Sequence, residues 1–136
     1  GGSLSNLKLG VEDSVDILLE FNHGSTSVPA HVHIDYLQRP SRRICEIIGD
    51  KAYINFDFFN NELIIQRNFD REIKKLSYIN FDRDEMFIDA LKEFFYCVEN
   101  NTCTSHDLEE GIKSLKISFA ARDSMVNGRV ANIDID

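Results

Sequence analysis

Apolar and polar residues alternate along the first third of the chain with the period of a β-strand. Between Val11 and Phe21 every second residue is apolar except Asp13, and mostly polar residues fill the other set. A second alternating run extends from Val28 to Arg39, and the intervening residues 22–25 (Asn-His-Gly-Ser) have turn chemistry. Because successive side chains of a strand point to opposite faces, the pattern predicts two half-buried strands joined as a long hairpin.

Shorter runs continue this pattern. They predict strands at Ile44–Ile48, Ala52–Phe59, Leu63–Arg67 and Ile73–Tyr78, and a last strand at Val130–Ile133. Asn60 and Asn61 are typical of a tight turn. Connections of hairpin length favour a mostly antiparallel sheet.

Helical spacing begins near Asp82, a candidate N-cap, and the first predicted helix ends at residues 100–101. Its apolar stripe consists of Phe87, Ala90, Leu91, Phe94 and Val98. A second helix is predicted from Thr104, with Asp107 in its first turn, to residues 127–128. Gly111 lies inside this helix, where glycine is unfavourable, so we expect a close packing contact there.

Strands first and helices afterwards are typical of an α+β fold. We expect a mostly antiparallel, open-faced sheet of about six to seven strands, with the two helices packed on one face. The other face would stay open. It carries Glu20, His31, His33, Asp35 and Arg39. An open face of this kind invites a ligand or a partner.

Composition narrows the function classes. The 136 residues suit one domain, and 15 basic against 23 acidic residues give a net charge of −8. This charge disfavours nucleic acid and anionic membranes as partners, and no apolar run approaches the ~20 residues of a membrane span. Residues 1–3 (Gly-Gly-Ser) resemble a cloning scar, so we expect residues 4–136 to form a single domain from a longer chain.

The three cysteines, Cys45, Cys97 and Cys103, contain no Cys-x-x-Cys pair, and their odd number predicts neither a disulfide framework nor a zinc site. A reducing cytoplasm is the simplest compartment for such a chain. The seven glycines fit neither a dinucleotide fingerprint nor a phosphate-binding loop. We therefore predict no cofactor-binding residue.

One candidate site lies on the predicted hairpin. His31, His33 and Asp35 alternate on one strand face, and their residue types suit a transition metal. The first and third of these positions lie ~13 Å apart on an extended strand, which favours the alternative of a polar packing face and no bound metal. Asp13 and Asp16 are expected on opposite strand faces, so they would not form an acid–base pair.

A second candidate is a basic corner in this acidic chain. Arg39, Arg42 and Arg43 surround Pro40 and Ser41 between two predicted strands. Guanidinium groups suit carboxylates, phosphates and sugar hydroxyls, and corners of a rigid scaffold are common positions for sites. The alternative is that these arginines pair with some of the many acidic residues.

Several segments, in order, resemble the C-terminal domain of the Gfo/Idh/MocA oxidoreductases. Residues 12–24 (Glu-Asp-Ser-Val-Asp-Ile-Leu-Leu-Glu-Phe-Asn-His-Gly) and 32–40 (Val-His-Ile-Asp-Tyr-Leu-Gln-Arg-Pro) resemble its first sheet hairpin. Residues 45–49 (Cys-Glu-Ile-Ile-Gly) resemble the next strand and turn, and 87–99 with 104–128 resemble its late helix pair. The resemblance covers Leu7 to Asp134.

This resemblance implies that the parent protein oxidises or reduces sugars or polyols with NAD or NADP. The cofactor would bind to an N-terminal Rossmann domain of the same polypeptide. That domain's GxGxxG motif, its Glu-Lys-Pro stretch with the catalytic lysine, and the family's Asp-x-x-x-His helix are not in this sequence. The chain alone is therefore expected to bind no cofactor, to hold no catalytic residue and to be inactive.

The resemblance also implies two binding roles. The open sheet face of the family commonly forms a homo-oligomer contact, which places His31, His33 and Asp35 at an oligomer interface. The corner before Cys45 corresponds to a segment that contacts substrate in some relatives. A sugar-type small molecule would bind there, at Arg39, Ser41 and Arg42.

The alternative function is a stand-alone α+β domain that binds a ligand or serves assembly without redox activity. It would have its own pocket between the sheet and the helices, with a buried polar group inside. The large apolar residues and the absence of an obvious buried acid favour the oxidoreductase domain instead.

Overall fold

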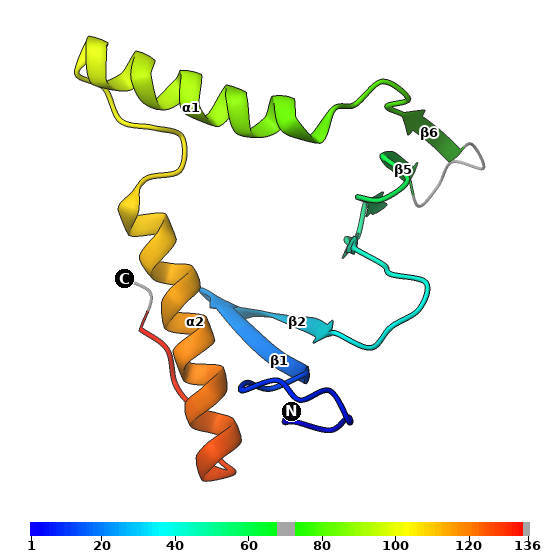
Figure 1. The fold of residues 1–136 in the computed structure, drawn as a ribbon, viewed down its shortest axis with the longest axis vertical. Helices are drawn as coiled ribbons and strands as arrows, with labels where there is room; N and C mark the ends of the chain where they lie inside the picture. Colours follow the sequence, from blue (N-terminus) through cyan, green and yellow to red (C-terminus); the bar gives the residue numbers. More distant parts are fainter. Residues whose placement is uncertain (68–72, 135–136) are drawn as a thin grey trace. The chain divides into compact units, whose positions relative to one another are not determined.

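The computed structural model describes residues 1–67 and 73–134 and has the predicted α+β class (Figure 1). Its elements are β1 (Ser14–His23), β2 (Thr26–Asp35), β3 (Ile44–Ile48), β4 (Ala52–Asp57), β5 (Glu62–Arg67), β6 (Ile73–Ser77), α1 (Arg83–Asn100) and α2 (Leu108–Asn127). The chain divides into two compact units. The first comprises Gly1–Leu37 and Thr102–Asp136, and the second comprises Gln38–Asn101.

In the first unit, β1 and β2 form the predicted hairpin as a two-stranded antiparallel sheet. Gly24 turns the chain with a φ of 60°, a left-handed conformation that glycine adopts without a Cβ clash. The first strand begins at Ser14 rather than Val11. Asp13 is held instead by the N-terminal segment, because its N–H donates to the carbonyl oxygen of Gly2 at 3.1 Å.

In the second unit, four antiparallel strands pair in the order β3-β4-β5-β6. The predicted bounds of β3 are confirmed. The fourth strand ends at Asp57 rather than Phe59, because the Asp57 carboxylate accepts the N–H groups of Phe59 at 3.0 Å and Asn60 at 3.1 Å. The predicted turn is present, with Asn61 at a φ of 51°.

The predicted single sheet of six to seven strands is not confirmed, since the described strands form one sheet of two and one of four. The prediction of a strand at Val130–Ile133 is wrong. Residues 129–134 have no strand structure, and no described strand pairs with them. An alternating run becomes a strand only where a sheet edge satisfies its backbone groups.

Both helices have the caps that their flanking residues favour. The Asp82 carboxylate accepts from the N–H of Asp84 at 2.9 Å, and Asn101 ends α1 in the left-handed conformation. The second helix begins after Asp107 rather than at Thr104, because the Asp107 carboxylate accepts from Glu110 N–H at 3.0 Å. Gly128 ends it with a φ of 62°.

Packing of the helices on a sheet face is also not confirmed within either unit. Among the described elements of each unit, extensive contacts join neighbouring strands and not a helix to a strand. The α1 stripe remains more than half exposed at Phe87, Leu91 and Phe94, and only Cys97 and Asp13 are buried among the described residues. The apolar surfaces are thus left without a covering layer within each unit.

The close contact expected at Gly111 is absent among the described residues, since a Cβ built there meets no atom within 4 Å. Gly111→Ala should therefore stabilise the chain by about 0.5–1 kcal/mol, because alanine loses less backbone entropy in a helix. Urea unfolding followed by circular dichroism at the helix band measures this. A variant less stable than the wild type would contradict the prediction. It would indicate that another part of the protein packs closely against α2 at Gly111.

Candidate functional site

The hairpin has one apolar face and one largely polar face. The strand register places opposite one another the pairs Ser14–Asp35, Asp16–His33, Leu18–His31, Glu20–Pro29 and Asn22–Ser27. We call the side of the hairpin that carries these ten residues the polar face. Leu18 lies in its central row and is 83% exposed. The neighbouring positions Val15, Ile17 and Leu19 belong to the apolar face.

Four side chains of the polar face form a continuous hydrogen-bonded network. His33 Nδ1 lies 2.8 Å from Asp16 Oδ1, and His33 Nε2 lies 3.0 Å from Asp35 Oδ2. His31 Nε2 lies 3.0 Å from the same Asp16 oxygen. The structure thus brings together the three residues singled out from the sequence and adds Asp16.

Asp16 was missed, although a signal for it exists. If residues 24 and 25 form the tip of the hairpin, the register must pair His23 with Thr26 and therefore Asp16 with His33. Sequence alternation alone assigns a residue to a face and leaves its cross-strand partner open. The turn position would have supplied that partner.

The geometry of this network has a consequence for protonation. A neutral imidazole carries one N–H, whereas both ring nitrogens of His33 face a carboxylate oxygen, so only the protonated ring can donate to both. Hydrogen bonds to Asp16 and Asp35 accordingly raise the pKa of His33. Hydrogen bonds from His33 and His31 lower the pKa of Asp16. Of the two acids in the network, Asp35 is the more enclosed, with its side chain 9% exposed against 60% for Asp16.

The network does not have the form of a metal centre. In the described part of the chain, no group of three or more His, Cys, Asp or Glu side chains could hold a metal ion. What this network can do chemically is hold a proton on the His33 ring between two carboxylates. No described nucleophile lies in the network, so we assign it no covalent chemistry.

The basic corner lies in the second unit, in the segment without regular structure that precedes β3. Arg39 donates through Nη1 to the carbonyl oxygen of Gln38 at 2.8 Å. The Arg43 guanidinium lies 4.8 Å from the centre of the Phe58 ring, which suits a cation–π contact. Ser41 lies in the same exposed segment.

Arg42 interacts with the negative charges of Glu46 and Asp57. Hydrogen bonds from Tyr53 at 2.6 Å and Asn55 at 3.1 Å lower the pKa of Glu46, and the charge of Arg42 lowers it further. Contacts from Asn60 lower the pKa of Asp57, to which Arg42 also contributes. Glu46 and Asp57 thus supply negative charge of the kind with which the alternative interpretation pairs these arginines.

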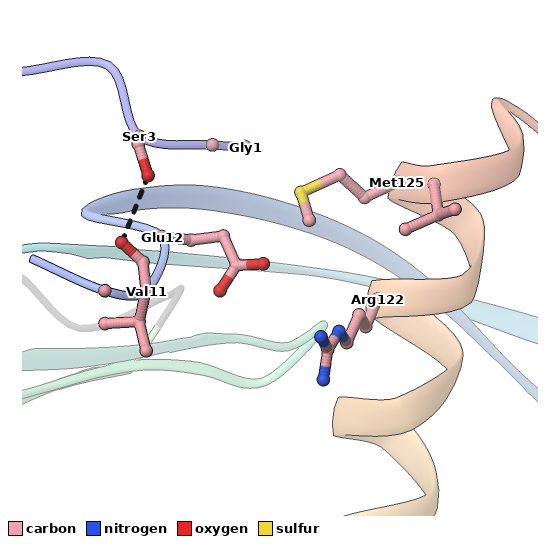
Figure 2. Close-up of a pocket in the computed structure, with 9 residues that line it drawn as sticks. Gly1, Ser3, Val11, Glu12, Arg122 and Met125 are labelled. Carbon is pink, nitrogen blue, oxygen red and sulfur yellow. Dashed lines mark hydrogen bonds between the residues drawn. The ribbon is translucent and has the colours of Figure 1, made fainter.

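A hollow of about 420 Å³ lies in the first unit between the N-terminal segment and α2 (Figure 2). Its lining consists of Gly1, Gly2, Ser3, Gly10, Val11, Glu12, Arg122, Met125 and Val126. Glu12 and Arg122 both extend into it, and Ser3 Oγ donates to the Val11 carbonyl oxygen at 3.1 Å. This is not the pocket between sheet and helices that a stand-alone domain was expected to have.

Asp13 is the one buried acid among the described residues, with 1% of its surface exposed. Its carboxylate accepts from Leu4 N–H at 2.7 Å, Ser5 N–H at 3.0 Å and Ser5 Oγ at 2.6 Å. The Ser5 hydroxyl and the Leu4 amide lower the pKa of Asp13. Because these three contacts of the carboxylate hold the N-terminal segment, we assign Asp13 a structural role.

The described helices offer no phosphate-binding turn. They begin after Asp82 and Asp107, and neither the segment before α1 nor that before α2 contains a glycine. A dinucleotide site needs a glycine-rich turn at such a helix start.

The chain matches no protein-family model, no curated protein sequence and no solved structure. The family resemblance therefore stays a prediction. In the described part of the chain, neither helix has the length and apolar character needed to cross a membrane.

Proposed function

We propose that this chain is the substrate-binding and oligomerisation domain of an NAD(P)-dependent sugar or polyol dehydrogenase, and that it is inactive alone. The ordered resemblance over Leu7–Asp134 supports this assignment, as does the α+β class. NAD or NADP and the catalytic lysine belong to a Rossmann domain of the same polypeptide. The odd number of free cysteines supports a cytoplasmic location.

The observation that carries the assembly role is the β1–β2 hairpin. Its strands have ten residues each, and among the described strands they pair only with each other. A two-stranded hairpin alone is at best marginally stable in water. Its apolar face is half exposed at Val28 and Ile34. A hairpin of this kind requires cover from other parts of an assembly.

We propose that the two described sheets belong to one open-faced sheet in the assembled protein, with α1 and α2 on its apolar side. Apolar residues on α1 and on the four-stranded sheet supply the two surfaces that would pack against each other. The α1 stripe includes Phe87, Leu91 and Phe94, and the register aligns Ile47, Ile54 and Ile65 across three strands. Burial of such surfaces contributes about 25 cal/mol per Å².

The open side of that sheet faces a second copy of the chain in this proposal. His31, His33 and Asp35 contribute to the contact, and Leu18 provides an exposed apolar centre. Interfaces commonly combine an apolar centre with a polar rim. A sugar-type molecule binds at the basic corner, where Arg39, Ser41 and Arg42 supply donors to its hydroxyl or acidic groups.

A second candidate function is a stand-alone domain that binds a small ligand. The hollow beside α2 favours it, because Glu12 and Arg122 present opposite charges to one space. A small zwitterion would match those charges, with its carboxylate on Arg122 and its ammonium on Glu12. Gly1–Ser3 forms part of the lining of this hollow. If those residues are a cloning scar, the hollow supports this candidate less strongly.

Reading the source gene upstream of the Leu4 codon separates the two functions. A frame that continues through a Rossmann fingerprint, a Glu-Lys-Pro stretch and an Asp-x-x-x-His helix supports the dehydrogenase. A start codon immediately before Leu4 overturns it and leaves the stand-alone domain. The assembly role is tested separately by sedimentation of the chain over a wide concentration range, in which we expect reversible self-association.

A further inference from the structure

We infer that self-association through the polar face is controlled by protonation of His33. The contact forms while His33 is charged and weakens when His33 loses its proton. This inference rests on the proposed oligomer contact and adds its regulation.

His33 can hold both acids of the network only when each of its ring nitrogens carries a proton. His33 places one ring nitrogen on Asp16 and the other on Asp35, at 2.8 and 3.0 Å. With the ring protonated, both contacts are charge-assisted hydrogen bonds, which are the stronger kind. Without that proton, one ring nitrogen and one carboxylate oxygen present lone pairs to each other, and the bridge between the two acids breaks.

The groups around the His33 ring are mostly acidic. Asp16 faces His33 from β1, and His31 and Asp35 lie beside it on β2. Glu20 lies farther along β1, where it accepts from Ser27 Oγ at 2.6 Å. Loss of the His33 proton removes a positive charge from a group in which acids already predominate. Two copies of the same face then repel each other more strongly, because an isologous contact brings like surfaces together.

A second copy on the polar face would also change the burial of His33. Asp35 is 9% exposed, whereas the His33 side chain is 45% exposed in the chain by itself. A second copy on the polar face would exclude water from His33 and strengthen its attraction to both acids. Loss of water also opposes the charged ring, and in this proposal the two carboxylate contacts outweigh that cost in the complex, so association takes up a proton. Because contacts with Asp16 and Asp35 already raise the pKa of His33 above 6.5, the transition lies on the alkaline side of that value.

Sedimentation of the chain at about pH 6 and about pH 8.5, at one ionic strength, tests this. A shift of one pKa unit on association corresponds to a tenfold change in the dissociation constant. Each His33 of an isologous dimer contributes that factor, so we expect the dissociation constant to be about 100-fold lower at the lower pH. His33→Gln should associate with the same affinity at both values. His106→Gln is the matched control, because it removes an imidazole outside the hairpin and should keep the full pH dependence.

Four results would overturn the inference. Equal dissociation constants at the two pH values, or an unchanged pH dependence in His33→Gln, would refute the switch and leave the oligomer contact standing. A chain that stays monomeric at all concentrations and both pH values would refute the contact itself. A nuclear magnetic resonance titration that gives His33 a pKa at or below its ordinary value would refute the double bridge.

Discussion

Replacing Leu18 by Asp is expected to weaken self-association of the chain by about 100-fold or more. Leu18 is 83% exposed in the central row of the polar face, between Asp16 and Glu20 on the same strand. The substitution therefore removes no internal packing from the hairpin. In the contact it would bury a carboxylate without a partner, which costs several kcal/mol, and each 1.4 kcal/mol corresponds to a factor of ten.

Sedimentation equilibrium of the wild-type chain and the variant measures this effect, and circular dichroism verifies that the fold is retained. Ile79→Asp is the matched control, since Ile79 is 91% exposed and lies in the second unit between β6 and α1, outside the strands of the proposed open sheet. It should associate as the wild type does. If Leu18→Asp also dimerises normally while the wild type self-associates, the contact lies elsewhere on the molecule.

Local signals in the sequence predicted the local parts of this fold well. The bounds of β3 and the C-terminal ends of α1 and α2 agree with the structure, because turns and caps depend on the chemistry of a few neighbouring residues. Asn101 and Gly128 take the left-handed conformation, which glycine adopts without a Cβ clash and which asparagine tolerates better than most residues. Asp82 supplies a carboxylate to the first turn of its helix.

The wrong strand predictions arise from contacts between residues that are far apart in the sequence. The alternation from Val11 predicted a strand through Asp13, but the Asp13 side chain binds backbone groups eight and nine residues earlier. The alternation of apolar and polar residues does not show that a side chain will bind the backbone of another segment. The run at residues 130–133 likewise has strand character, and whether it pairs depends on an available sheet edge that the sequence does not reveal.

The candidate site shows the same division. Strand alternation was enough to place His31, His33 and Asp35 on one face, and the structure joins them in one network. The fourth member, Asp16, required the hairpin register. At the corner, the sequence revealed the arginines but not the hydrogen-bonded Glu46 beside them, because that contact is also made across strands.

Asp13→Asn is expected to release the N-terminal segment from the start of the hairpin. The Asp13 carboxylate accepts three hydrogen bonds, from Leu4 N–H, Ser5 N–H and Ser5 Oγ, and the side chain is buried. An asparagine side chain has one acceptor oxygen, and its amide group would face donors. At least one buried donor would lose its partner, so hydrogen exchange at the Leu4 and Ser5 amides should accelerate by about tenfold or more.

The pH dependence of the wild-type chain gives a second measurement of the same contact. Because these hydrogen bonds lower the pKa of Asp13 below its ordinary value of 3.8, their contribution is fully present above that pH. It is lost as the pH falls through the lowered pKa, so both amides should stay protected at neutral pH and lose protection only in stronger acid. Glu12→Gln changes the adjacent carboxylate and should leave both amides protected. Unchanged exchange in Asp13→Asn would show that strand pairing at Ser14, rather than Asp13, holds this segment.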